Sequence, residues 1–209
     1  MLLSLGLSWK LSPQSRVLAG SLCGVAVLCV FLIAGRSAEN TVRALYAKHF
    51  SEESVVDTAL WPMPGDPACW AAVVVSRGSR DRMILRRAML APFPTVLSAA
   101  NCPSYRLPTT APLVEVVAEA DERVAWGKQL SVSIESWNSL ARRCDVRAYL
   151  QFSRAPFFIL QGDTILLGDL RFDRTDRRDF AEAEFPATPG PCPSWLPAWE
   201  PPRADLLSL

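Results

Sequence analysis

The sequence from Trp70 to Leu90, WAAVVVSRGSRDRMILRRAML, contains two apolar runs separated by a short polar segment. The runs Trp70–Arg77 and Arg82–Leu90 are rich in valine, leucine, isoleucine and methionine, and each has the length of an ordinary strand. The segment SRGSRD between them contains Gly78, a residue that tolerates a positive φ and therefore favours a tight turn. This stretch predicts an antiparallel β-hairpin.

Further strands and helices are predicted after this hairpin, with Gly162 and Asp163 supplying a second tight turn. The other predicted strands are Leu130–Ile134, Phe157–Gln161, Thr164–Phe172 and Phe180–Phe185. The predicted helices are Leu113–Trp126 and Trp137–Phe152, with a break near Arg143–Asp145 if Asp145 caps a separate final turn. Strands joined by tight turns, with helices gathered in the middle, indicate an α+β domain in which helices cover an antiparallel sheet.

The N-terminal part of the chain contains one long apolar run, Val17–Ala34 (VLAGSLCGVAVLCVFLIA), which carries no charged residue. At about 1.5 Å per residue it extends roughly 27 Å, close to the ~30 Å hydrocarbon core of a bilayer. We therefore predict a single-pass membrane helix, although a cleaved signal peptide remains an alternative. Basic residues on the two sides of the run nearly balance, so the topology stays open.

These predictions divide the chain into four parts. Residues 1–9 are an apolar stub, and residues 10–50 are the membrane helix and its extension, which has one apolar stripe. The α+β domain covers residues 51–185. Residues 186–209 form a proline-rich tail, in which Trp195 and Trp199 are expected to pack on the domain.

Charge and histidine content restrict the function. The chain has 22 Lys+Arg and 21 Asp+Glu, a net charge of +1, which argues against nucleic acid as a partner. The single histidine, His49, lies on the apolar stripe of the helix extension, so we expect a packing role for it. We expect no catalytic residue, no metal ligand and no cofactor. The expected partners are the membrane and a multi-span membrane protein.

Four of the six cysteines, Cys69, Cys102, Cys144 and Cys192, lie in the predicted soluble part, and none forms a C-x-x-C pair. They are either buried free thiols or, if this side of the membrane is periplasmic, two disulfides, and we favour free thiols.

The stretch GDTILLGDLRFDRTDRRD contains five aspartates, at positions 163, 169, 173, 176 and 179. Arginines alternate with them, and the spacing of a calcium loop is missing. On the predicted strand, Asp169, Arg171 and Asp173 would share one face, which indicates a structural ladder of carboxylates and guanidinium groups. Only if the chain were a hydrolase would these carboxylates hold a divalent metal such as zinc.

Three segments carry a resemblance to a known family: WPMPGDPACW at 61–70, FSRAPF at 152–157 and GDLRF at 168–172. Together with the membrane helix upstream, they resemble the C-terminal part of a bacterial inner-membrane metal-dependent hydrolase family (YdjM-like). In that family, preceding membrane helices carry the histidines and aspartates of the metal site, and nothing in this sequence corresponds to them. The resemblance implies a truncated or stand-alone relative in the bacterial inner membrane.

What the resemblance implies for individual residues is structural. It implies a polar network of Arg154, Asp169 and Arg171, and a rigid lead-in to the sheet. The motif residues are Pro62, Pro64, Pro67, Trp70, Phe152, Ser153, Pro156 and Phe172. Two hypotheses follow: a single-span membrane protein with a non-catalytic α+β domain or, alternatively, a membrane-bound metal-dependent hydrolase or its C-terminal half. A secreted, disulfide-bonded domain is a third reading and requires signal cleavage.

Overall fold

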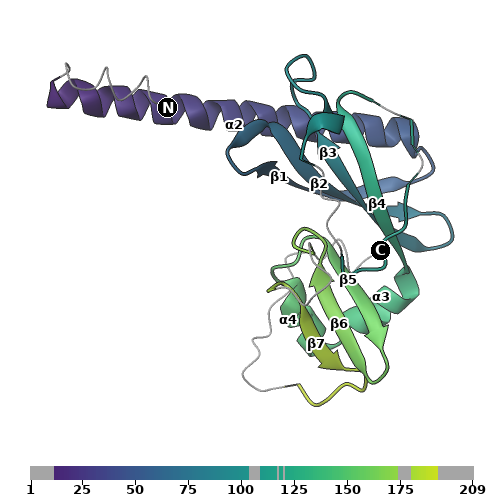
Figure 1. The fold of residues 1–209 in the computed structure, drawn as a ribbon. Coiled ribbons are helices and arrows are strands. Elements are labelled where there is room, and N and C mark those ends of the chain that lie inside the picture. The colour runs from purple at the N-terminus through teal and green to yellow at the C-terminus, as the bar shows by residue number, and fades with distance from the viewer. Residues whose placement is uncertain (1–11, 104–108, 117, 120, 174–179, 193–209) are drawn as a thin grey trace.

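The computed structural model describes residues 12–103, 109–116, 118–119, 121–173 and 180–192, so the tail beyond residue 192, including both of its tryptophans, lies outside the described residues. One long helix is followed by two antiparallel sheets with short helices between them (Figure 1). In chain order the elements are α2 (Pro13–His49), β1 (Ser54–Met63), β2 (Asp66–Gly78), β3 (Arg82–Leu90), the 3-10 helix η1 (Ala99–Asn101), β4 (Val124–Ser133), α3 (Ile134–Ala141), α4 (Cys144–Leu150), β5 (Pro156–Gln161), β6 (Thr164–Asp169) and β7 (Ala183–Pro186). The predicted α+β class is confirmed.

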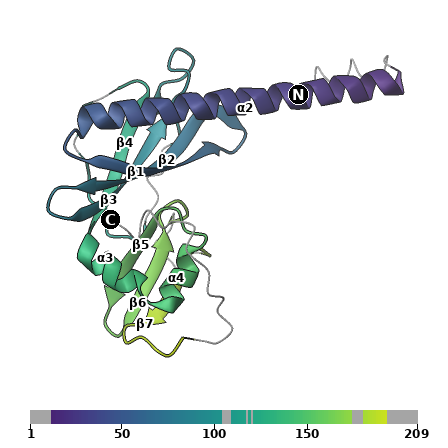
Figure 2. The same ribbon diagram turned by 180° about the vertical axis from the view of Figure 1, so that it is seen from behind.

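Helix α2 is continuous from Pro13 to His49 and has two different surroundings. It begins at the N-cap Ser12, whose hydroxyl accepts a hydrogen bond from the backbone N–H of Ser15 at 3.3 Å, with proline at the first helical position. Its N-terminal part extends beyond the rest of the molecule (Figures 1 and 2) and exposes its apolar side chains. From Ala34 onward one stripe is buried, consisting of Ala34, Ala38, Val42, Leu45 and Tyr46.

The first sheet has the strand order β1-β2-β3-β4, and each strand pairs antiparallel with its chain neighbour. The predicted hairpin is its centre, with Trp70 opposite Leu90 and Gly78 opposite Arg82. The positive φ angles of the β2–β3 turn fall on Arg80 and Asp81, not on Gly78 as the sequence suggested. In the β5–β6 turn, Gly162 does have a positive φ, +59°.

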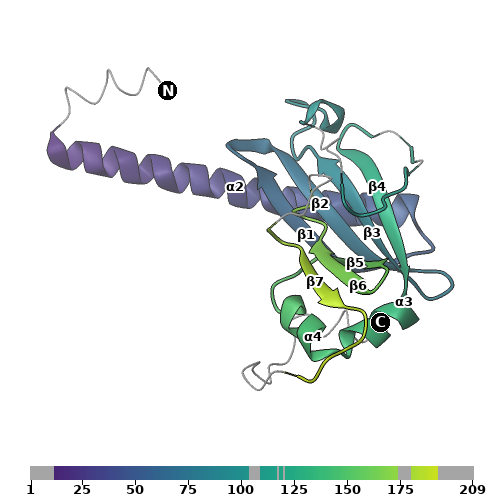
Figure 3. The same cartoon turned by 60° about the horizontal axis from the view of Figure 1, so that its bottom comes forward.

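Strand β2 is buried on both faces, which accounts for its unbroken apolar run. Successive residues of a strand point to opposite faces. Ala72 and Val74 therefore contact the cluster built on α2, whereas Val73 and Val75 belong to the core shared with the second sheet. Helix α2 and the second sheet thus cover opposite faces of the first sheet (Figures 2 and 3).

The second sheet, of order β5-β6-β7, follows the two short helices. Ser133 caps α3 by accepting a hydrogen bond from the backbone N–H of Ser136 at 3.4 Å. The fully buried Trp137 of α3 stacks on Phe158 of β5, with ring centroids 5.8 Å apart. In place of the single predicted helix Trp137–Phe152 there are two helices, α3 and α4, with the break near Arg143 that the sequence indicated.

Several other predictions were wrong. The segment Leu113–Trp126 is not a helix, because Val124 begins β4 and Val114 forms a bridge with Gln129. Its apolar spacing suits a helix locally, but pairing with β3 satisfies backbone groups that would otherwise lack partners. Strand β1 was not predicted at all. The predicted strand Thr164–Phe172 ends at Asp169.

The preference for free thiols in the soluble part was also wrong. Cys69 is bonded to Cys102, and Cys144 to Cys192. The two pairs are 33 and 48 residues apart, so local spacing carried no signal of them. Among the described residues, the free cysteines are Cys23 and Cys29, both exposed on α2.

Candidate functional site

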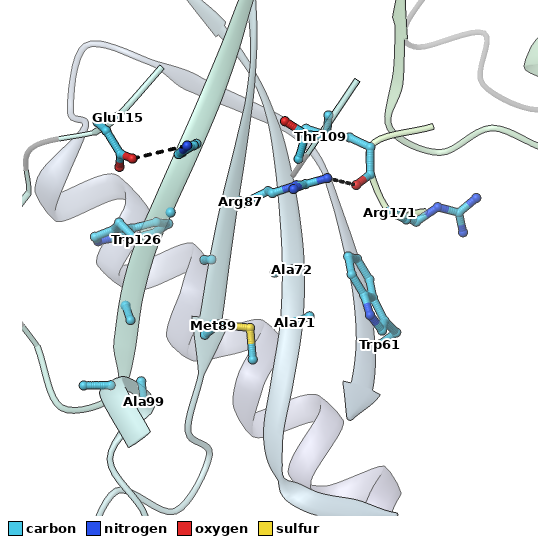
Figure 4. A pocket seen from close by; sticks show the side chains of 16 residues that line it. Trp61, Ala71, Ala72, Arg87, Met89, Ala99, Thr109, Glu115, Trp126 and Arg171 are labelled. Atoms are coloured by element: carbon cyan, nitrogen blue, oxygen red, sulfur yellow. Dashed lines mark hydrogen bonds and ion pairs between the residues drawn. The ribbon is translucent and has the colours of Figure 1, made fainter. Parts of the chain in front are cut away.

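A cleft of about 570 Å³ lies on the face of the first sheet that is turned away from α2 (Figure 4). Small residues of β2 and β4, including Ala71, Ala125 and Gly127, line it. Larger side chains at these positions would fill the space. The small residues therefore keep this part of the sheet accessible.

The walls of the cleft come from distant parts of the chain. Trp61 from β1 and Met89 from β3 supply apolar walls (Figure 4). Arg87 from β3 supplies a guanidinium group, whereas the guanidinium of Arg171, which follows β6, points away from the cleft and bonds to Asp169 (Figure 4). The arrangement places an indole ring and positive charge around a floor of small residues.

Protein partners hold these charged groups in place. Arg87 donates to the backbone oxygen of Leu170 at 2.9 Å and to that of Asp173. Lys128 forms an exposed ion pair with Glu115, with 3.5 Å between nitrogen and oxygen. Each cation of the lining is paired with a carboxylate: Arg87 with Asp173 at 3.7 Å, Lys128 with Glu115, and Arg171 with Asp169 at 2.6 Å. A ligand with a flat apolar part would match the apolar walls, and a polar group on it could bond to the exposed Lys128.

The described lining residues also restrict the chemistry of the cleft. Their one hydroxyl, on Thr109, donates to the backbone oxygen of Ala111 at 3.0 Å. Their one carboxylate is that of Glu115. This set offers a ligand apolar contact, charge and a few hydrogen-bonding groups.

The predicted residues Arg154, Asp169 and Arg171 are brought together beside the cleft. The carboxylate of Asp169, 1% exposed, accepts from the backbone N–H of Arg154 at 2.9 Å and from the Arg171 guanidinium at 2.6 Å. The hydroxyl of Ser153 donates to it at 3.1 Å. The Arg154 guanidinium lies elsewhere and forms an ion pair with Asp57 of β1 at 3.1 Å. These contacts position Arg171 and tie the second sheet to β1.

The predicted ladder of Asp169, Arg171 and Asp173 on one strand face was wrong, because the chain turns after Asp169. Asp173 is buried and accepts from the backbone N–H groups of Thr110 and Ala111, at 2.8 and 3.2 Å. Asp163 lies in the exposed β5–β6 turn, and the aspartates at 176 and 179 lie outside the described residues. Within the described part of the chain, no group of three or more His, Cys, Asp or Glu side chains could hold a metal ion.

The motif at 61–70 forms the hairpin between β1 and β2. Pro62 lies near the end of β1 and Pro64 in the turn, and the backbone oxygen of Pro67 accepts from the indole N–H of Trp70 at 3.0 Å. The Trp70 ring packs on α2 at Gly35, where an added Cβ would lie 2.8 Å from the ring. Trp70 therefore fixes the helix, whereas Trp61 faces the cleft.

The other two motifs contact each other. The backbone N–H of Leu170 donates to the oxygen of Ala155 at 2.8 Å, and Arg171 donates to that of Phe152 at 3.2 Å. Pro156 begins β5 and is buried. Phe152 is 61% exposed, and the Phe172 ring lies 4.7 Å from the Arg171 guanidinium.

Sequence reasoning missed a buried polar network at the end of α2. Arg86 of β3, 3% exposed, bonds to both carboxylate oxygens of Glu53, at 3.0 and 3.2 Å. Tyr46 and Ser76 also donate to Glu53. Burial alone raises the pKa of Glu53, but the hydrogen bonds from Arg86, Tyr46 and Ser76 outweigh it and hold the pKa below its usual value. An arginine inside an apolar strand was the one local signal of this network.

Two further groups belong to the same end of α2. Burial and the neighbouring Glu53 raise the pKa of the Tyr46 phenol above its usual value, so it remains a donor. His49 packs beside Phe50 and Trp126, with ring centroids 6.3 Å from each. These residues anchor the helix to the sheet.

Comparisons with protein-family models, with curated proteins and with solved structures find no match to this chain.

Proposed function

We propose that this chain is a single-span membrane protein whose α+β domain lies on the oxidising side of the membrane and binds a partner without catalysing a reaction. The proposal rests on the observation that α2 is one continuous helix whose N-terminal part is exposed and whose C-terminal part is buried. Its N-terminal part exposes apolar side chains, including Val17, Leu22 and Ile33, whereas its C-terminal part is packed in the domain.

The exposed part of α2 is long and apolar enough to cross a membrane. Leaving a large apolar side chain in water costs about 1.5–3 kcal/mol relative to burial, and lipid removes that cost. The helix continues from this part without a break into the buried Ala34, Ala38 and Val42. Signal cleavage near Ala34 would cut a helix that the domain uses, which favours an anchor over a cleaved signal.

The two disulfides support the orientation. Disulfides persist mainly in oxidising compartments such as the periplasm or the cell exterior. The domain that contains Cys69–Cys102 and Cys144–Cys192 would therefore lie outside the cytoplasm, with Arg16 on the cytoplasmic side. The disulfides thus favour one of the two topologies that the balanced flanking charges left open.

The cleft supports a binding role. It combines small apolar residues, the indole of Trp61 and the cations Arg87 and Lys128. An aromatic or apolar group that carries a carboxylate fits this chemistry. A multi-span membrane protein that presents such a group would be the corresponding partner.

The relation to the metal-dependent hydrolase family remains part of the proposal. Its support is that two of the motifs, FSRAPF and GDLRF, meet around Asp169 through Ser153, Arg154 and Arg171. The chain would then be a stand-alone or truncated relative that keeps the scaffold of the soluble domain.

The orientation can be tested with fusions at the C-terminus in a bacterial host. Alkaline phosphatase, which needs disulfides to fold, should be active, and a fluorescent protein that matures only in the cytoplasm should stay dark. A Leu22→Arg, Val25→Arg variant should leave the membrane fraction, since each charge at the bilayer centre costs about 2.5–3.5 kcal/mol. A Leu22→Ile, Val25→Ile variant is the matched control. Inactive phosphatase, or an intact mass that lacks the N-terminal helix, would overturn the proposal.

The cleft can be tested with 2-naphthoate, an aromatic carboxylate, by saturation-transfer NMR on the full chain in detergent. We expect binding to be lost in Ala125→Phe, which fills the cleft, and weakened in Lys128→Glu. Ala44→Phe adds the same side chain on the exposed side of α2 and should bind as wild type. Equal signals in all four proteins would remove the cleft from the proposal.

A further inference from the structure

The first sheet has one end near the membrane-spanning part of α2 and one end far from it. Gly35 of α2 lies against Trp70 at the start of β2, and Tyr46 bonds to Ser76 near the end of β2 at 2.7 Å. Tyr46 follows Gly35 by eleven positions, which corresponds to about 16 Å along the helix axis. The strand β2 therefore runs away from the membrane together with α2.

Two loops lie at the near end. One is the tip of the β1–β2 hairpin, and the other follows β3, whose last residue, Leu90, pairs with Trp70. The disulfide between Cys69 and Cys102 holds the second loop beside the start of β2. We call these two loops, Pro62–Pro67 and Pro92–Leu97, the near-membrane rim.

The loops at the two ends of β2 differ in charge. Residues 58–65 (TALWPMPG) and 88–100 (AMLAPFPTVLSAA) contain no charged residue. Asp66, the one charged residue of the rim, accepts a hydrogen bond from the backbone N–H of Ala68 at 2.8 Å. The charged residues that surround the far end are Glu52, Glu53, Arg77, Arg80, Asp81 and Arg82. Exposed charges also lie at the near end just before β4, where the backbone oxygens of Glu122 and Arg123 accept from the backbone N–H groups of Ala99 and Ala91 at 2.8 and 2.9 Å. Of the described residues at this end, the two loops of the rim carry Asp66 as their one charge, so they could enter a lipid interface with little movement of charge out of water.

The length of α2 places the rim at the depth of that interface. A span that starts at Val17 needs about 20 residues to cross the hydrocarbon core and so reaches Arg36. Phe31 and Ala34 already pack in the cluster that includes Trp70 and Phe93. The domain thus begins within the last turns of the span, and no free stretch of helix separates the rim from the bilayer surface.

We propose that the near-membrane rim rests in the lipid headgroup layer and fixes the orientation of the domain on the membrane. The occupant of this surface is the bilayer in which α2 is embedded. Val96, 77% exposed, would be inserted from one loop, and the exposed Pro64 from the other. Because the rim has no cluster of basic residues, its contact should not depend on anionic lipids. This inference rests on the proposed function, since it requires α2 to span the membrane.

The test uses the full chain in phosphatidylcholine nanodiscs. In a Cys23→Ser, Cys29→Ser background that keeps both disulfides, a single cysteine carries an environment-sensitive fluorophore. The labelled variants are Val96→Cys and Pro64→Cys at the rim, Ser79→Cys at the exposed far end as the matched control, and Leu22→Cys in the span. Intact mass under non-reducing conditions and circular dichroism show which variants are folded.

We expect lipid-borne quenchers at headgroup depth to quench the two rim labels several-fold more than the Ser79 label, and deep quenchers to act on the Leu22 label. The rim result should persist when phosphatidylglycerol is added. If Leu22 is quenched but both rim labels behave like Ser79, the inference fails and the proposed anchor stands. If the Leu22 label is not quenched, the anchor itself fails and the rim with it.

Discussion

Arg86 and Arg87 are neighbours on β3, yet they serve opposite faces of the first sheet. Arg86 points towards α2, where it pairs with the Glu53 carboxylate and lies 3.5 Å from the centre of the Phe50 ring. Arg87 points towards the second sheet, where it donates to backbone oxygens of Leu170 and Asp173. The end of α2 is thus joined to the sheet by the Glu53–Arg86 pair, to which Tyr46 of α2 also bonds. Arg87 holds the second unit, by which we mean α3, α4 and the second sheet, mainly through backbone oxygens, with a longer ion pair of 3.7 Å to the buried Asp173.

The apolar contacts on the two faces differ as well. Helix α2 contributes mostly small side chains, such as Ala34, Ala38 and Val42. The second unit contributes large ones, among them Trp137 and Phe157. Contacts between small residues allow close approach, and the position of α2 is set by Trp70 against Gly35 and by the Glu53–Arg86 pair beside Tyr46. The second unit is held to the first sheet mainly by packing of large apolar side chains over a wide area. Mutations in this core should therefore lower the free energy of unfolding most.

The largest expected effect follows from removing a large side chain from the core between the first sheet and the second unit. Trp137→Ala should lower the free energy of unfolding by about 3–5 kcal/mol, because it removes a fully buried indole and leaves a cavity. Urea titration in detergent, followed by circular dichroism, measures the change. Phe152→Ala, at an exposed aromatic, is the control and should change the stability by less than about 0.5 kcal/mol. A small loss for Trp137→Ala would contradict the assignment of the main core to this face.

Removing the disulfide at the near end should have the next largest effect. Cys69→Ser, Cys102→Ser should lose about 2–4 kcal/mol, since the unfolded chain regains the freedom of a long loop. Cys23→Ser, Cys29→Ser replaces two exposed free thiols and should leave unfolding unchanged. Equal stability of the two double variants would show that the near-end bridge is not formed.

Breaking the Glu53–Arg86 pair tests whether this pair holds the end of α2 to the first sheet. Glu53→Ala leaves Arg86 without its carboxylate and should cost about 2–3 kcal/mol, somewhat less than a fully enclosed pair because Glu53 is 14% exposed. The paired variant Glu53→Ala, Arg86→Met should recover part of the loss, because the uncompensated charge is gone. Urea titration of the three proteins measures this. No recovery in the paired variant would indicate that Glu53 acts through another contact.

The same pair predicts a pH dependence. The pKa of Glu53 is lowered in the folded state, so its contribution is complete above the unfolded pKa of about 4.3 and is lost as the pH falls through the folded pKa. The stability advantage of wild type over Glu53→Gln should therefore be constant near neutrality and shrink below about pH 4. An advantage that grows on acidification would have the wrong sign for a carboxylate held in its charged form.

Local patterns predicted those parts of the fold in which local sequence and tertiary structure agree. The β2–β3 hairpin has continuous apolar runs because β2 is covered on both faces, and the stripe of Val42, Leu45 and Tyr46 is buried as its spacing indicates. The error at Leu113–Trp126 arose where the two disagree. Helical spacing was overridden there by the need of β3 for a partner strand.

The candidate site depended far more on long-range contacts. The cleft exists because Trp61, Ala71, Gly127 and Arg171 meet from four separate segments, and no motif links them. The carboxylate of Asp169 and the guanidinium of Arg171 were near enough in sequence to be paired in advance. Neither the pairing of Glu53 with Arg86, 33 residues away, nor the pairing of the cysteines could be predicted from the sequence. Only the folded chain brings these groups together.

The smallest expected effect concerns the ion pair of Arg154 with Asp57, which crosses between the second unit and β1. The Arg154 side chain is 47% exposed, so water screens the pair and its net value should be about 0.2–1 kcal/mol. In Arg154→Gln the backbone N–H still donates to Asp169, so the packing of the second unit should persist. A double-mutant cycle with Asp57→Asn, measured by urea titration at low and high salt, gives the coupling energy directly. A coupling well above 1 kcal/mol that resists salt would mean that the second unit depends on this exposed pair as strongly as α2 depends on the Glu53–Arg86 pair, and the contrast between the two faces would no longer hold.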